Sequence, residues 1–369
     1  MNLFADKERT AKMPAPQSIG MFEWLDICGE PYCQEVRDQL ERMLSNYPNE
    51  EKAGLLRRIA SDISPDHRSG LTELVVHEWL LSAKCSSVEV EPALKGQGGH
   101  PDFLSITPDG FSFYTEVASR GDDKDFKDSL IDEINKVVSP YYLEIRLRGK
   151  PSAIPSISRI CGDVQAWVKN IQPDEPDVRY FYDKDGLTFE LTLIGPKKVL
   201  SSRTIGAQWS GEAEWVSVTG DIEKSLKKKA SKYGDLGAPY VVVVSSDQFT
   251  VGYEQVREAL FGTFAVIFDP DDPEGTTRNI RNPDGIWIGP GSKPRNTRLS
   301  AVVFLSNPNA TNLGRCKPII FKNPWAVHSM NFDFLCADAF EVGDNEIIQT
   351  KKGKSLGELF GLSKKWPNS

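Results

Sequence analysis

The sequence predicts an α/β protein built around a mixed β-sheet with helices packed on it. Apolar residues recur at helical spacing over residues 71–81, and runs of strand character follow at residues 87–92, 102–106 and 111–119. A continuous β-branched apolar run at residues 240–245 is typical of a strand buried on both faces. Helices and strands in this order predict a layered α/β sandwich.

Two acidic residues belong to a predicted β-hairpin. Side chains in the strand at residues 111–119 alternate between faces, so Glu116 points away from the strongly apolar face. Asp102 opens the preceding strand, and residues 107–110 between the two strands have the composition of a turn. We therefore expect the carboxylates of Asp102 and Glu116 to lie close together. Neighbouring carboxylates repel one another unless one is protonated or a cation lies between them, and Mg²⁺ prefers oxygen ligands of this kind.

A third acidic residue lies upstream, where Glu73 and His77 are i, i+4 neighbours on the helix predicted at residues 71–81. The order of this helix, a strand, a strand opened by Asp102 and a strand with Glu116 resembles the core of the PD-(D/E)xK nuclease superfamily, and also a bacterial restriction-endonuclease-like family. The resemblance implies a restriction-endonuclease-like mixed-sheet core and a site that binds Mg²⁺ or Mn²⁺. In that site Asp102 matches the motif aspartate, Glu116 the acidic residue of the E-x-K element and Glu73 the helix glutamate. All three are implied as catalytic residues and metal ligands.

Ala118 departs from the family pattern, which has lysine at this position. A lysine there orients or activates the attacking water and offsets negative charge in the transition state. The helix predicted at residues 222–233 precedes the strand at residues 240–245, and if that strand joins the sheet, one helix face covers the site. Lys228 or Lys229 then supplies the missing cation from a different element. The alternative is that these lysines are solvated and that Ala118 marks lost or weakened catalysis.

The resemblance implies divalent-metal-dependent hydrolysis of phosphodiester bonds in nucleic acid, with DNA favoured over RNA and host defence as the setting. Two alternatives remain open. A catalytically inactive nuclease-fold module would bind nucleic acid or a protein partner, whereas a metal-dependent hydrolase of small phosphorylated molecules would suit the acidic net charge. Zinc-protease chemistry is excluded, because Leu81 stands where an H-E-x-x-H motif needs its second histidine.

The composition is that of a soluble globular protein. Among 369 residues, 52 acidic and 44 basic side chains give a formal net charge of -8, the wrong sign for coating nucleic acid nonspecifically. No apolar stretch approaches the roughly 18–20 residues that span a bilayer, and the first residues lack a signal-peptide pattern, so we expect a cytoplasmic protein without a membrane partner. The six scattered cysteines form no C-x-x-C pair, which argues against a zinc site and a disulfide framework.

Five regions are expected along the chain. Prolines and small polar residues near the start predict a mobile tail. The nuclease-like core that contains Asp102 and Glu116 is expected to include a helix at residues 125–138 and a strand at residues 141–148. In chain order the regions are a mobile tail (1–20), an N-terminal helical cap (21–68), the PD-(D/E)xK-like core (69–150), an α/β elaboration that completes the sheet (151–309) and a C-terminal segment (310–369).

Overall fold

The computed structural model covers the chain and divides it into two units, each of which is described by itself. Unit 1 comprises residues 1–13, 21–122 and 217–369, and unit 2 comprises residues 14–20 and 123–216. The residues that the structure describes are 2–13, 15, 19–61, 64–94, 99–120, 126–149, 156–172, 178–184, 187–197, 204–210, 218–246, 251–267, 278–289, 293–342 and 347–368.

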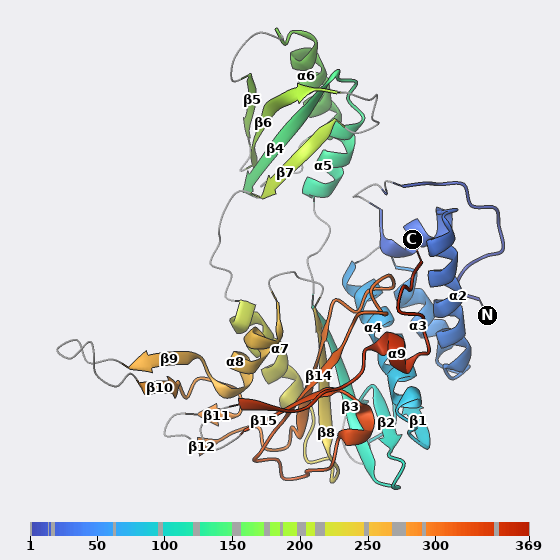
Figure 1. Ribbon diagram of the computed structural model, residues 1–369, viewed down its shortest axis with the longest axis vertical. Helices are drawn as coiled ribbons and strands as arrows, with labels where there is room; N and C mark the ends of the chain where they lie inside the picture. The colour runs from blue at the N-terminus through green and yellow to red at the C-terminus, as the bar shows by residue number, and fades with distance from the viewer. Residues whose placement is uncertain are drawn as a thin grey trace. The chain divides into compact units, whose positions relative to one another are not determined.

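Unit 1 is built on a mixed sheet of eight strands (Figure 1). The first three strands pair antiparallel, the third and the next two pair in parallel, and the far side of the sheet adds both kinds of pairing. The expected α/β class with a mixed sheet is therefore confirmed. The strands, in their order across the sheet, are β1 (Ser87–Val90), β2 (Phe103–Ile106), β3 (Ser112–Arg120), β8 (Tyr240–Ser246), β13 (Ala301–Ser306), β14 (Pro318–Lys322), β15 (Asp338–Val342) and β16 (Ile347–Lys351).

Two helices cover the faces of strand β3. Helix α4 (Ser64–Ser82) packs against β3, and the ring of His77 on this helix lies 6.0 Å from that of Phe103. Helix α7 (Val218–Ala230) also packs against β3 and shares a buried apolar cluster with Ala118. Because Thr115 is paired with Phe103 and adjacent strand residues face opposite sides, α4 covers one face of β3 and α7 covers the face that carries Glu116 and Ala118.

Strand β8 joins the sheet beside β3, as its sequence predicts. All seven of its residues are buried, because α7 covers one face and neighbouring strands flank both edges. The connection from β3 to its parallel neighbour β8 passes through unit 2 and then through α7, the helix that precedes β8. Within unit 1 the elements therefore follow in the order α4–β1–β2–β3–α7–β8.

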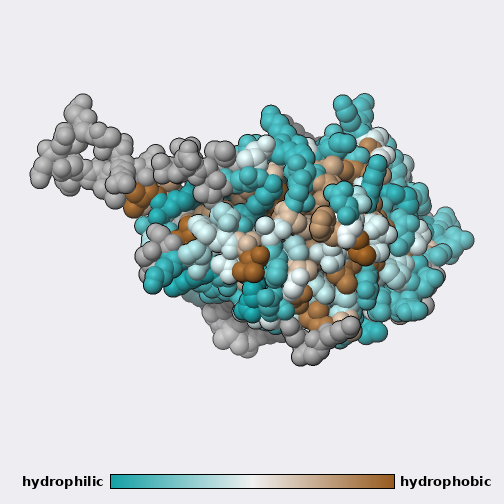
Figure 2. All heavy atoms as spheres, turned by 90° about the horizontal axis from the view of Figure 1, so that it is seen from below, coloured by the Kyte–Doolittle hydropathy of each residue, from teal (hydrophilic) through white to brown (hydrophobic). Residues whose placement is uncertain are grey.

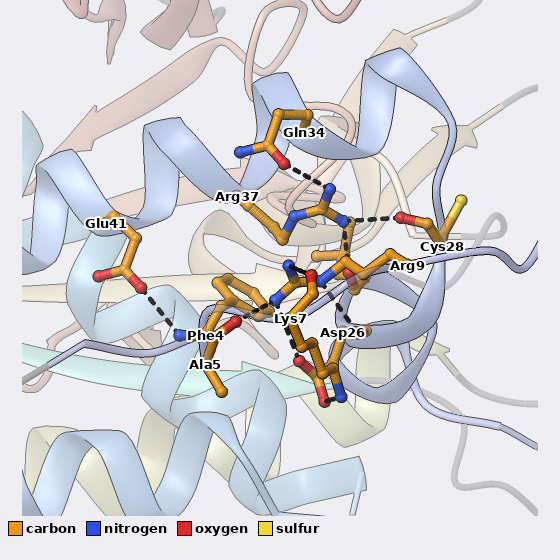
Figure 3. A network of polar contacts seen from close by, with 10 residues as sticks. Phe4, Ala5, Lys7, Arg9, Asp26, Cys28, Gln34, Arg37 and Glu41 are labelled. Carbon is orange, nitrogen blue, oxygen red and sulfur yellow. Dashed lines mark hydrogen bonds and ion pairs between the residues drawn. The ribbon is translucent and has the colours of Figure 1, made fainter.

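The N-terminal part of unit 1 is helical, as expected, with three helices before α4. They are α1 (Met21–Ile27), α2 (Pro31–Asn46) and α3 (Lys52–Ile59). The prediction of a mobile tail is corrected for residues 2–13, since Phe4 is buried and its main-chain N–H donates to Glu41 of α2 at 2.8 Å. Figure 3 shows Arg9 of this segment and the buried Arg37 of α2, whose guanidinium groups donate to main-chain carbonyl oxygens around them.

The C-terminal residues 310–369 contribute more than the short apolar pieces that their sequence suggests. They supply strands β14, β15 and β16 of the large sheet, a single 3₁₀ turn η2 (Asp333–Leu335) and the short helix α9 (Leu356–Leu359). Between β8 and β13 lie α8 (Tyr253–Phe261), a ribbon of β9 (Phe264–Ile267) and β10 (Arg278–Arg281), and the short pair β11 (Ile288–Gly289) and β12 (Lys293–Pro294). The Gly- and Pro-rich stretch at residues 270–294 therefore contains strands where the structure describes it.

Unit 2 has its own sheet and its own apolar core. Its strand order is β5 (Arg179–Lys184), β6 (Leu187–Pro196), β4 (Tyr141–Gly149) and β7 (Ile205–Ser210). Helices α5 (Phe126–Asn135) and α6 (Ile157–Lys169) bury apolar residues against the side chains of β4 and β6 that alternate inward. The expectation that a helix at residues 125–138 and a strand at residues 141–148 belong to the core with Glu116 is therefore corrected. They form unit 2, while α7 and β8 take the corresponding places in unit 1.

Figure 2 shows one face of the protein, on which apolar side chains form only small groups among hydrophilic ones. Within the described part of the chain, no helix is both long enough and apolar enough to cross a membrane.

Candidate functional site

Asp102 and Glu116 lie opposite one another at the start of the β2–β3 ladder. The ladder pairs Phe103 with Thr115, so the next opposed positions are 102 and 116. Directly opposed residues of antiparallel strands have Cβ atoms about 4.5–5.5 Å apart. The Asp102 carboxylate also accepts a hydrogen bond from the main-chain N–H of Val117 at 2.5 Å, which holds it against β3.

Glu116 is completely buried, and both of its carboxylate oxygens have donors. Lys229 Nζ lies 2.5 Å and Lys232 Nζ 2.7 Å from Glu116 Oε1. The hydroxyl of Tyr233 lies 2.8 Å from Oε2 and 2.6 Å from the main-chain oxygen of His100. Because all three donors come from the end of α7 and the turn after it, this one segment neutralises the buried acid and ties it to the strand that carries Asp102.

The sequence of α7 explains why these lysines meet Glu116. Ile222, Leu226 and Ala230 recur every four residues and are buried, so they direct one helix face onto the sheet. Lys229 precedes the last of these and lies at the edge of the buried face, whereas Lys228 is exposed. Cations at a helix C-terminus also interact favourably with the helix dipole. Of the two lysines considered from the sequence, the structure brings Lys229 to Glu116 and leaves Lys228 in solvent.

Burial raises the pKa of Asp102 to about 7, with the negative charge of Glu116 as the second cause. The charge of Glu73 acts in the same direction, whereas the hydrogen bond from Val117 and the charge of Lys229 lower the pKa. The negative charges of both other acids of the predicted site thus act on Asp102. A raised pKa is expected of a buried carboxyl group that lies close to a second carboxylate.

The tyrosines beside the acids remain protonated. Burial, followed by the hydrogen bond and charge of Glu116, raises the pKa of Tyr233, so its hydroxyl stays a donor. Burial likewise raises the pKa of Tyr240, which donates to the main-chain oxygen of Lys229 at 3.2 Å. The end of α7 is therefore anchored to β8 at the residue that carries one of the two ammonium groups.

Glu73 lies on α4 and is committed to an ion pair. Arg58 of α3 donates Nη1 to Glu73 Oε2 at 2.6 Å and Nη2 to Oε1 at 2.8 Å, and the buried hydroxyl of Tyr47 donates to Oε1 at 2.6 Å. This fork-shaped pairing uses the planar geometry of the guanidinium group. The charges of Glu73 and Arg58 both act on Asp102, so the pair lies within electrostatic range of the site although its hydrogen bonds are made within the helical layer.

His77 packs between rings instead of joining the acids. Its ring lies 4.7 Å from that of Tyr47, and burial lowers its pKa to about 4, so it is neutral at physiological pH. Its Nδ1, together with Ser105 Oγ and Thr115 Oγ1, is buried without a hydrogen-bond partner among the described atoms. Ser105 and Thr115 lie on the α4 face of the sheet, away from the lysines.

The described residues contain no group of three or more His, Cys, Asp or Glu side chains that could hold a metal ion. Arg58 takes both oxygens of Glu73, and Lys229, Lys232 and Tyr233 donate to both oxygens of Glu116. An ion bound between Asp102 and Glu116 would therefore compete with these donors for the oxygens of Glu116. Asp102 and Glu116 offer the carboxylate oxygens that a hard divalent ion prefers. Burial first, and the negative charge of Glu116 second, raise the pKa of Asp102, and a cation would relieve the repulsion between the two acids.

Sequence reasoning did not place Lys232, Tyr233, Arg58 or Tyr47 at the acidic site. Lys232 and Tyr233 follow Lys229 at three and four residues, so helical spacing was a usable signal for them. Nothing in the local sequence marks Arg58 or Tyr47, because their role depends on how α2 and α3 pack on α4.

No protein-family model, no curated protein and no solved structure matches this chain.

Proposed function

We propose that this protein is a divalent-metal-dependent phosphodiesterase that cleaves nucleic acid, with DNA preferred to RNA, on a restriction-endonuclease-like core. The observation that carries the proposal is that Asp102, just before β2, lies against β3 next to Glu116, and that Lys229 of α7 contacts Glu116. Two acids and a cation on this order of elements are what the resemblance to PD-(D/E)xK nucleases requires.

In this proposal Asp102 and Glu116 hold Mg²⁺ or Mn²⁺, and Glu73 supports them through its charge while it remains paired with Arg58. When bound, the ion polarises the phosphate and lowers the pKa of a water molecule. The protein supplies the buried acids, the hydrogen bond from Val117 that orients Asp102, and the tyrosine hydroxyl that orients Glu116.

Lys229 supplies the positive charge that Ala118, at the position of the family's lysine, cannot supply. Its ammonium group lies on the same face of β3 as Ala118 and beside Glu116. A fixed cation in a partly buried site stabilises negative charge that develops on a phosphate during the reaction. The missing lysine of the E-x-K element is thereby replaced from a separate helix.

The test is a cleavage assay with plasmid and oligonucleotide DNA and RNA in the presence of Mn²⁺ or Mg²⁺. Wild-type protein is expected to cleave, whereas Glu116→Gln, Asp102→Asn and Lys229→Ala are each expected to reduce cleavage at least a hundredfold. Lys228→Ala is the matched control from the same helix turn and should retain wild-type turnover. Circular dichroism and melting temperature establish that each variant is folded.

An inactive nuclease-fold module is the second candidate function. It is favoured by the two lysines that neutralise Glu116 and by the pairing of Glu73 with Arg58, because these cations already balance two of the three acids that would hold an ion. Binding of nucleic acid without cleavage by any divalent metal would support this module and contradict the nuclease. Cleavage of small phosphorylated molecules with no dependence on salt would instead support a small-molecule hydrolase.

A further inference from the structure

We propose that Lys232 binds a phosphate group of the phosphodiester backbone of nucleic acid. Its ammonium group is the more exposed of the two that contact Glu116. This inference deepens the proposed function and rests on it for the class of ligand. It assigns a specific contact to a residue that lies outside the pattern of acids and lysine taken from the resemblance.

The first support is the number of cations on one acid. Lys229 and Lys232 both approach the same oxygen, Glu116 Oε1. A single carboxylate balances only one of the two positive charges that contact it. The Arg58–Glu73 pair adds no net charge nearby. Glu116 and the two lysines on it together therefore carry one net positive charge, which favours an anion.

The second support is unused hydrogen-bonding capacity. A lysine ammonium group has three N–H donors. Among the residues that the structure describes, Glu116 is the only hydrogen-bond acceptor of the Lys232 ammonium group, which otherwise lies over the ring of Tyr233 at 4.9 Å. Donors remain free at the place where a phosphate oxygen would approach.

The third support distinguishes Lys232 from Lys229. The side chain of Lys232 is 40% exposed and lies in the turn after α7, whereas that of Lys229 is 24% exposed and lies within the helix. The charge of Lys229 also acts directly on Asp102. Lys229 is thus the inner cation of the acid pair. Lys232 has a flexible stem and access to solvent, and Glu116 keeps Lys229 and Tyr233 as donors when Lys232 turns to a phosphate.

The experiment measures binding without metal, so that it is independent of cleavage. A fluorescein-labelled DNA oligonucleotide is titrated with protein in EDTA at several NaCl concentrations, and fluorescence anisotropy gives the affinity. Lys232→Gln is expected to weaken binding about three- to tenfold at low salt. It should also reduce the slope of log affinity against log salt by about 0.7–0.9, the value for one phosphate contact. Lys232→Arg should keep the wild-type slope, and Lys228→Gln is the control.

The proposal is overturned if Lys232→Gln keeps the wild-type slope, if Lys228→Gln loses as much, or if wild-type protein shows no salt-dependent binding. If Lys232→Gln melts at the wild-type temperature, its weaker binding is not a folding defect. Wild-type binding by Lys232→Arg would show in addition that the positive charge is what binding requires. Failure of the proposed function looks different. If binding depends on Lys232 but no cleavage occurs in Mn²⁺, the phosphate contact is supported and the nuclease is contradicted. If the protein cleaves but Lys232→Gln keeps the wild-type salt slope, the nuclease is supported and the phosphate contact is contradicted.

Discussion

Lys229 and Glu116 are 113 positions apart in the chain, yet Lys229 Nζ lies 2.5 Å from Glu116 Oε1. Residues 123–216 between them belong to unit 2, which closes its own sheet over its own apolar core. Because the inserted unit satisfies its own strands, β3, α7 and β8 pack as consecutive elements. The acid and its cation therefore meet in spite of the long separation in sequence.

Lys229→Met should destabilise the protein, because it leaves a fully buried carboxylate with one ammonium group and one hydroxyl as donors. A hydrogen bond to a charged group contributes about 1.5–3 kcal/mol, and we expect a loss in this range. Lys228→Met, on the exposed side of the same turn, should change the free energy of unfolding by less than about 0.5 kcal/mol. Urea unfolding at pH 7.5 measures both, and equal losses would contradict the assigned contact.

Stability should fall as pH rises towards neutrality on account of Asp102. Its pKa in the folded protein is raised to about 7 from an ordinary value of 3.8, so the folded state binds more protons than the unfolded state between these values. The free energy of unfolding therefore decreases with rising pH across this window. Asp102→Asn should remove the decrease, which urea unfolding at pH 5 and pH 7.5 detects as a difference on the order of 1–2 kcal/mol between the two proteins.

His77 contributes with the opposite sign. Its pKa is lowered to about 4 from 6.5, so its contribution to stability is lost as pH falls from 6.5 towards 4. The comparison of wild type with Asp102→Asn cancels this contribution, because both proteins retain His77. A pH profile that is the same in the two proteins would contradict the raised pKa of Asp102.

Mn²⁺ should raise the melting temperature, because an ion that binds only the folded state stabilises it by mass action. At a hundred times its dissociation constant this amounts to about 2.7 kcal/mol, or several degrees. The rise should be larger at pH 8 than at pH 6, since Asp102 must lose its proton to bind the ion. Differential scanning fluorimetry with and without Mn²⁺ provides the measurement. An undiminished rise in both Asp102→Asn and Glu116→Gln would show that the ion binds elsewhere.

Residues 123–216 should fold as an isolated fragment. The apolar side chains of α5 and α6 pack on those of β4 and β6 within this range, so the fragment contains both sides of its core. We expect a cooperative thermal transition and dispersed amide signals in a proton–nitrogen NMR spectrum. A control in which Leu191, a fully buried residue of β6, is replaced by Asp should lose both. A fragment that is unfolded without any substitution would contradict the division into two units.

Much of the local structure could be predicted because its signals are periodic and near in sequence. Helix α4, the hairpin of β2 and β3, and the buried strand β8 each occupy the stretch that their apolar pattern indicates. The opposition of Asp102 and Glu116 follows from the same pattern, since a short turn sets the register of a hairpin.

The local pattern of apolar residues could not predict which strands belong to the same sheet. A helix and a strand directly after β3 were assigned to its core because they come next in the chain, whereas the structure places them in unit 2 as α5 and β4. The alternation of β4 is that of a strand with one buried face, whereas β8 is buried on both faces, and only the complete set of strand pairings decides between them.

The sequence by itself determined the secondary structure of the core, the α/β class and the presence of an acidic pair on one hairpin, because these depend on alternation and turns over a few residues. The tertiary structure alone decided that Glu73 pairs with Arg58, that residues 123–216 form a unit with its own sheet and core, and that Lys229 and Lys232, and not Lys228, contact Glu116. These outcomes required the packing of elements distant in sequence, where burial of an apolar helix face fixes which of several adjacent lysines points inward.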